Sequence, residues 1–194
     1  MDTFHVFTDG ACIGNPGPGG YGVVIVGASG RRELSGGFRR TTNNRMEIFA
    51  AVAALRALEK PSKGVLHSDS RYVVDSIAKG WAVGWRKKNW MRTKTERALN
   101  SDLWQIMLEL LEPHEIRFQW VRGHAGHAEN ERCDHLANTA ARGRELVVDD
   151  GYERPAVNAP SSSSPRAESP PSPRTRTSPP PKPSPRASGG LFGD

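Results

Sequence analysis

The sequence has only two cysteines among its 194 residues, Cys12 and Cys133. Two thiols are too few for a disulfide framework, which excludes a small disulfide-stabilised extracellular domain and favours a reducing compartment. No stretch approaches the roughly 20 consecutive apolar residues of a membrane-spanning helix, and the first residues, MDTFHVF, lack the basic and apolar segments of an export signal. We therefore expect no membrane association and a cytoplasmic protein.

Acidic residues are fewer than basic ones: 21 Asp and Glu against 27 Lys and Arg give a net charge of +6. This surplus favours association with nucleic acid or another anionic surface. Proline is scarce before residue 152, and eleven of the fifteen prolines follow it together with nine serines. Such a segment cannot bury enough apolar surface to offset the entropy lost on ordering. We predict a folded domain over residues 1–148 and a disordered tail over residues 149–194.

Three interpretations of the tail stay open. It is a basic tether that adds phosphate contacts, a site for a partner or for phosphorylation at its Ser-Pro steps, or a solvated extension without a specific role. The sequence identifies no partner for it.

The pattern of apolar residues before the tail predicts alternating strands and helices. Strands are predicted at 4–9, 21–26, 33–41, 65–69 and 116–121. Helices are predicted at 43–58, 102–111 and 129–142, with a helical excursion over about 80–97. The predicted buried face of the first helix comprises Met46, Phe49, Ala50, Ala53, Ala57 and Leu58. This order indicates an α/β fold whose mixed sheet begins as an antiparallel meander and continues with parallel strands reached through helices.

Four carboxylates occupy positions that such a fold would direct to one place: Asp9, Glu47, Asp69 and Asp134. Asp9 and Asp69 are predicted at the ends of strands, where open α/β sheets bind their ligands. Any one acid alone would be interpreted as a surface or capping residue. Four clustered acids repel one another, so the simplest reason to gather them is a hard divalent cation that takes oxygen ligands. The chemistry they indicate is metal-assisted phosphodiester hydrolysis.

Four sequence blocks carry a resemblance to a known family. FTDGACIGNPGPGGYG, TTNNRME, SDSRYV and VRGHAGHAENERCDHLA closely resemble the signature blocks of bacterial type 1 ribonuclease H, in the family's order and spacing over residues 3–141. The resemblance implies a ribonuclease H-like fold with a five-stranded sheet flanked by helices. It also implies a monomeric endonuclease that cuts the RNA strand of RNA–DNA hybrids, leaves 5′-phosphate and 3′-hydroxyl ends, and removes primers and R-loops.

The resemblance also implies roles for the acids and for one histidine. Asp9 would bridge two Mg²⁺ ions, with Mn²⁺ as a possible substitute. Glu47 and Asp69 would hold the ion on the leaving-group side, and Asp134 the ion that activates water. His124, in the glycine-rich GHAGH loop, would transfer protons and assist product departure. Zinc binding by His124 and His127 is disfavoured because no cysteine pair at zinc-ligand spacing accompanies them.

Contacts with a hybrid are implied by position in the matching blocks. Asn15, Asn43 and Asn44, beside the acids, carry amides that can both donate to and accept from a 2′-hydroxyl group. The backbone around Gly10 to Cys12, together with Asn43 and Glu47, resembles the family's minor-groove contacts with these hydroxyls. Arg71 stands where the familiar bacterial pattern often has an amide residue. Arg40, Thr42 and Asn100 match a pocket that holds a phosphate of the DNA strand. The protrusion over about 80–97 contributes Trp81, Trp85, Arg86, Lys87, Lys88 and Trp90.

Alternatives remain at several of these positions. Asn15 fits a simple Asx turn, the tryptophans fit packing of the protrusion onto the domain, and the cysteines fit small buried residues. For the whole chain, one rival function is a transposase- or resolvase-like nuclease that acts on DNA. A second is a hybrid-binding module without catalysis, which the loss of an acid would support, although none is lost.

Overall fold

The computed structural model of the chain describes residues 3–28, 30–123 and 125–154. Its strands are β1 (Thr3–Cys12), β2 (Gly17–Gly27), β3 (Gly30–Thr41), β4 (Lys63–Ser68), β5 (Glu115–Trp120) and β6 (Leu146–Val147). Its helices are α1 (Asn43–Arg56), α2 (Arg71–Ala78), α3 (Trp81–Lys87), α4 (Ser101–Leu111), α5 (Ala128–Ala141) and α6 (Asp150–Glu153). Each strand and long helix predicted from the sequence is present.

The strands form one mixed sheet in the order β5-β4-β1-β2-β3-β6. The pairs β1–β2 and β2–β3 are antiparallel, whereas β1–β4, β4–β5 and β3–β6 are parallel. The predicted α/β class and the meander followed by parallel strands are therefore confirmed. The predicted number of five strands is one too small, because β6 pairs only two residues with Gly37 and Phe38 and is too short to show a period of two.

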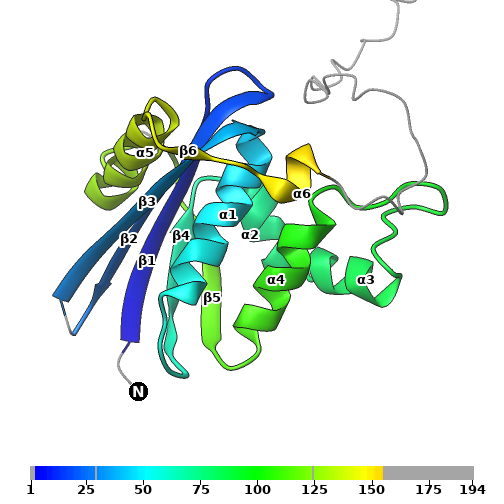
Figure 1. Cartoon of the computed structure of the whole chain (residues 1–194). Coiled ribbons are helices and arrows are strands. Elements are labelled where there is room, and N and C mark those ends of the chain that lie inside the picture. Colours follow the sequence, from blue (N-terminus) through cyan, green and yellow to red (C-terminus); the bar gives the residue numbers. More distant parts are fainter. Residues whose placement is uncertain (1–2, 29, 124, 155–194) are drawn as a thin grey trace, which may run out of the picture. The chain divides into compact units, whose positions relative to one another are not determined.

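Helices cover both faces of the sheet, with α1 and α4 on one side and α5 on the other (Figure 1). The prediction for the buried face of α1 was right for Met46 and Ala50, which are fully buried. It was incomplete, because Ile48, Val52 and Leu55 are buried as well. The reason is that α1 packs against the sheet with one side and against α4 with another, so its apolar surface is wider than a single stripe.

Glycines in β2 allow α5 to lie directly on the sheet. A Cβ atom on Gly20 would come within 2.3 Å of the Ala137 carbonyl oxygen, and one on Gly22 within 2.1 Å of the Cys133 carbonyl oxygen. Any side chain at these positions would push the helix away. This close approach fixes the distance between α5, which carries Asp134, and the strands of the sheet.

The folded part extends beyond the predicted boundary at residue 148. Asp149 is only 6% exposed, and its carboxylate accepts hydrogen bonds from Arg45 Nε (2.8 Å), Arg45 Nη2 (2.8 Å) and Thr41 Oγ1 (2.6 Å). α6 follows directly, and Glu153 accepts a bidentate pair from Arg39. The assignment of 149–154 to a disordered tail is therefore wrong, because a composition argument cannot detect one buried ion pair. The rest of the predicted tail, 155–194, lies outside the described residues.

Among the helices of the described chain, none has the length and apolar character required to cross a membrane.

Candidate metal centre

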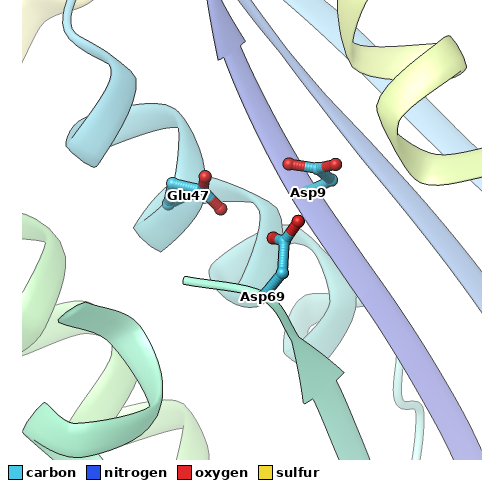
Figure 2. Close-up of side chains that lie close together, drawn as sticks. All are labelled: Asp9, Glu47 and Asp69. Carbon is cyan, nitrogen blue, oxygen red and sulfur yellow. The ribbon is translucent and has the colours of Figure 1, made fainter. Parts of the chain in front are cut away.

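Three acidic side chains from separate elements meet where β4 ends beside the inner strand β1 (Figure 2). β1 and β4 run parallel, and their last paired residues are Thr8 and Ser68, so Asp9 and Asp69 follow at the same level. Asp9 does not end its strand as predicted, because β1 continues along β2 to Cys12. The pairing of β1 with β4 ends one residue before Asp9, at Thr8.

Glu47 reaches the same place from α1. Gly10 makes this possible, because a Cβ atom there would lie 2.3 Å from the backbone nitrogen of Glu47. The helix therefore packs onto β1 as closely as backbone atoms allow. One carboxylate oxygen from each of Asp9, Glu47 and Asp69 lies within 4.8 Å of the others. Such spacing suits several oxygen ligands around a shared divalent cation.

Burial and mutual repulsion make the charged state of this cluster costly. Asp9 is 6% exposed, and burial, followed by the charges of Asp69 and Asp134, raises its pKa to about 8. The backbone N–H of Gly10, which donates to Asp9 Oδ1 at 2.7 Å, opposes this rise. Glu47 is 7% exposed, and burial followed by the charges of Asp9 and Asp69 raises its pKa well above the usual range. Bound cations would remove this cost by supplying the missing positive charge.

The hydrogen bonds around the cluster leave acceptors free for such a cation. Glu47 Oε1 accepts a long hydrogen bond from Asn43 Nδ2 (3.4 Å), whereas Glu47 Oε2 is buried without a partner among the described residues. Asp69 Oδ2 accepts a long bond from Asn130 Nδ2 (3.4 Å). A buried carboxylate oxygen without a donor is costly unless a ligand completes it. The donor set, all oxygen, fits a hard divalent cation.

Asp134, the fourth predicted acid, lies on α5 outside this group of three. It is half-buried, and its Oδ1 accepts a hydrogen bond from Asn138 Nδ2 at 2.7 Å. Its charge nevertheless contributes to the raised pKa of Asp9, so it faces the same region. The structure thus brings three of the four acids into direct proximity and places the fourth beside them.

The predicted proton-transfer residue, His124, lies outside the described residues. Its neighbour Gly123 approaches the cluster so closely that a Cβ atom there would lie 2.5 Å from Asp69 Oδ2. His127 precedes α5 and is exposed, and its side chain makes no capping hydrogen bond.

Several of the residues assigned to the minor groove lie at or near the N-terminal end of α1. Asn15 Oδ1 accepts a hydrogen bond from the backbone nitrogen of Asn43 at 3.2 Å, which joins two loops rather than closing a local Asx turn. Thr42 caps α1 by accepting from the backbone nitrogen of Arg45, and Asn44 is exposed. The half-buried Cys12 thiol points at the carbonyl oxygens of Gly17 and Thr41 (3.6 and 3.5 Å), and burial raises its pKa.

The residues assigned to the phosphate pocket are spread over three elements. Arg40 is exposed near the end of β3, one residue before Thr41. Asn100 precedes α4 in the left-handed conformation (φ 59°) and leaves the helix without a side-chain cap. Thr42, the third of these residues, is the N-cap of α1.

The three tryptophans of the protrusion differ in their surroundings. Trp85 and Trp90 are half-buried and pack against the hydrophobic core, where Trp85 meets the ring of Trp104 edge-on at 6.1 Å. Trp81 is 43% exposed, and Lys79 Nζ lies 5.1 Å from its ring centre. Arg86 pairs with Glu112 at 3.5 Å. Lys87 and Lys88 are exposed at the end of α3.

Two residues at the cluster were not singled out from the sequence. Asn130 is 2% exposed and directs its amide nitrogen to Asp69, and its Oδ1 has no partner in the described part of the chain. Trp120 donates from its indole nitrogen to the Asp69 carbonyl oxygen at 2.9 Å. Asn130 lies inside the GHAGHAENERCD block, so its place in the sequence could have indicated a role at the site. Nothing in the sequence indicated Trp120, because its position depends on the pairing of β5 with β4.

Comparison with known proteins gives a consistent result. Residues 1–142 match the family model described as RNase H. The chain is 52% identical over 148 residues to "Ribonuclease H" of Trichodesmium erythraeum, covering 76% of this chain and 94% of that protein. It is 55% identical over 148 residues to "Ribonuclease HI" of Synechocystis sp., covering 76% and 92%. Among solved structures, LC9-RNase H1, described as a type 1 RNase H, aligns with a TM-score of 0.66 at 36% identity, covering 74% of each chain.

Proposed function

We propose, on the premise that the chain belongs to the bacterial type 1 ribonuclease H family, that its carboxylate cluster cleaves RNA with two magnesium ions. The protein is a metal-dependent endoribonuclease that cuts the RNA strand of RNA–DNA hybrids. The proposal adds the two-ion mechanism, the identity of the metal, and the 5′-phosphate and 3′-hydroxyl products. The observation that carries it is the group of three carboxylates, two buried and one half-buried, whose oxygens lie within 4.8 Å of one another.

The four acids divide the work of holding the ions. Asp9, which is grouped with Glu47 and Asp69 and whose pKa is also raised by the charge of Asp134, would be the acid shared by both ions. Glu47 and Asp69 would hold the ion on the leaving-group side, and Asp134 the ion next to the attacking water. When bound, two such ions activate the water and stabilise the departing oxygen of the phosphodiester. Because burial and neighbouring charges raise the pKa of Asp9, cation binding at neutral pH would displace a proton from its carboxyl group.

The remaining catalytic role is assigned to His124. An imidazole titrates near neutral pH, so it can accept a proton and return it within one cycle. The assignment rests on its place in the GHAGH sequence.

Two surfaces are proposed to hold the hybrid. Asn43 offers an amide beside Glu47, which suits the combined donor and acceptor character of a 2′-hydroxyl group. Cys12, Asn15, Asn44 and Arg71 would complete this minor-groove side, and Arg40, Thr42 and Asn100 would hold a phosphate of the DNA strand. On the protrusion, exposed Trp81, Lys87 and Lys88 are proposed to contact the nucleic-acid backbone, whereas half-buried Trp85 and Trp90 support them.

The test is cleavage of one end-labelled RNA–DNA hybrid beside RNA duplex and DNA duplex controls, with Mg²⁺, with Mn²⁺ and with a chelator. The proposal expects cleavage of the hybrid alone, in the RNA strand, only with metal, and products that a 3′-hydroxyl-dependent polymerase extends. Cleavage of the DNA duplex would favour the transposase-like rival. Binding of the hybrid without cleavage in either metal would favour the non-catalytic module. We further propose that the protein is a monomer in solution and that it removes RNA primers and R-loops in the cytoplasm.

A further inference from the structure

Arg71, Trp120 and Asp69 form a chain of contacts that joins the protein surface to the carboxylate cluster. Trp120 is the last residue of β5, and its indole Nε1 donates to the Asp69 carbonyl oxygen at 2.9 Å. The guanidinium carbon of Arg71 lies 3.7 Å from the centre of the Trp120 ring. One indole therefore touches the main chain of a cluster acid with its edge and an arginine with its face.

The hydrogen bond from the Trp120 indole holds the main chain of Asp69, which lies beyond the last residue of β4. β4 ends at Ser68, whose carbonyl oxygen still accepts from the Val121 backbone nitrogen at 3.0 Å. Asp69 follows, outside any strand, and from the described part of the chain its side chain accepts one hydrogen bond, the long one from Asn130 Nδ2 at 3.4 Å. The Trp120 indole thus gives Asp69 its shortest hydrogen bond from a side chain. A residue that forms a hydrogen bond with a metal ligand, without binding the metal itself, orients that ligand.

The contact with the face of the indole ring holds the Arg71 guanidinium in place, where it can bind an anion. Arg71 is exposed at the first position of α2, and among residues 3–28, 30–123 and 125–154 no carboxylate lies within ion-pair distance of it. A guanidinium held against a ring face by a cation–π contact can still donate its N–H groups to another partner. The planar fork of these N–H groups suits the bidentate binding of a phosphate. Arg71 follows Asp69 by two residues in the sequence, and Trp120 contacts both of them.

We propose that Arg71 binds a backbone phosphate of the cleaved strand and that Trp120 positions both this arginine and Asp69, so that phosphate binding and metal binding share one support. This inference rests on the proposed function, because it assigns the phosphate to the strand being cut. The aromatic platform accounts for an arginine where the familiar pattern often has an amide: the charge is held in place by the ring rather than by a carboxylate.

Three variants and one control separate the two roles. Arg71→Gln removes the charge, Arg71→Lys keeps the charge without the flat fork, and Trp120→Phe keeps an aromatic face without the N–H donor. Arg56→Gln is the matched control, because it removes an exposed arginine nine residues beyond Glu47 on α1, about 13 Å along the helix axis. Steady-state cleavage of the hybrid at several salt concentrations gives kcat and KM. Calorimetric titration with Mn²⁺ in the absence of substrate gives metal affinity, and circular dichroism checks the fold.

Arg71→Gln is expected to raise KM about tenfold, leave kcat within about twofold, and lower the slope of log KM against log salt by about 1. Arg71→Lys should give a smaller rise in KM with the slope unchanged. Trp120→Phe is expected to weaken Mn²⁺ binding by about tenfold, within the range for loss of an outer partner of a metal ligand, and to lower kcat.

Equal KM and equal salt slopes for Arg71→Gln and Arg56→Gln would overturn the phosphate role. Wild-type Mn²⁺ affinity in a folded Trp120→Phe protein would overturn the positioning role. Failure of the proposed function looks different, because the wild-type protein itself would then leave the hybrid uncut.

Discussion

Replacing Asp9 with Asn should make the metal-free protein more stable while abolishing cleavage. Asn keeps the size of the side chain and removes its charge. The folded protein raises the pKa of Asp9 from 3.8 to about 8, chiefly through burial and then through Asp69 and Asp134. Between these pH values the folded chain holds a proton that the unfolded chain releases. The free energy of unfolding of the wild type therefore falls as pH rises from about 4 to about 8.

The size of the effect follows from this pKa. At about 1.4 kcal/mol per pKa unit, the cost of burying Asp9 reaches about 4 kcal/mol at pH 7. At pH 7 the folded wild type holds Asp9 mostly protonated, so Asn replaces a neutral carboxyl group and keeps an oxygen that can accept from the Gly10 N–H. We expect Asp9→Asn to be more stable than the wild type by up to about 4 kcal/mol at pH 7, and to differ little from it at pH 4.

Urea unfolding with a chelator, measured at steps between pH 4 and pH 8, tests this expectation. Added Mg²⁺ should stabilise the wild type, by about 1.4 kcal/mol at ten times its dissociation constant, and should stabilise Asp9→Asn far less. If the variant were equal to the wild type at pH 7 without metal, or less stable, the claim that the cluster is electrostatically strained would be refuted. Retained cleavage would refute the role of Asp9 as a metal ligand.

Three further changes have outcomes that the structure predicts. A chain ending at residue 148 should lose about 3 kcal/mol of stability in urea unfolding relative to one ending at residue 154, because buried Arg45 loses one of its two carboxylate partners; equal midpoints would contradict this. Gly22→Ala should destabilise the protein by at least about 2 kcal/mol and lower kcat, since its Cβ would lie 2.1 Å from a carbonyl oxygen of α5, and wild-type stability would show that the helix yields freely. His124→Ala should lower kcat about 100-fold with unchanged Mn²⁺ affinity, and an unchanged rate would count against proton transfer.

Much of the fold follows from local patterns in the sequence. The switch from alternating to helical periodicity after Thr41 predicted α1 within two residues of its observed end at Arg56. The elements that depend on distant partners could not be found in this way. Residues 146–147 form a strand only because Gly37 and Phe38 offer a free edge, and Asp149 is buried only because Arg45 is there to pair with it.

The same division applies to the candidate site. The four acids could be selected from the sequence because each is a carboxylate inside a characteristic sequence block, and that can be seen without a structure. Asn130 and Trp120 support Asp69 through contacts that connect residues 61 and 51 positions apart in the chain. The difference between exposed Trp81 and half-buried Trp85, four residues apart on α3, likewise depends on where Trp104 packs. Which residues hold a metal-binding side chain in place depends on tertiary packing. The sequence of a single helix or strand does not determine that packing.

The position of Glu47 shows how the chain keeps a repelling cluster together. Its carboxylate is pushed away by Asp9 and Asp69, yet the helix that carries it cannot withdraw. Two residues earlier on α1, Arg45 is 4% exposed and held by Asp102 and Asp149 from other parts of the chain. A buried ion network with well-formed hydrogen bonds is costly to break, so it holds the first turns of α1 against the sheet while the neighbouring acids repel. The free energy that the cluster loses to repulsion is the free energy that cation binding regains, which makes the strain a source of metal affinity rather than a defect of the fold.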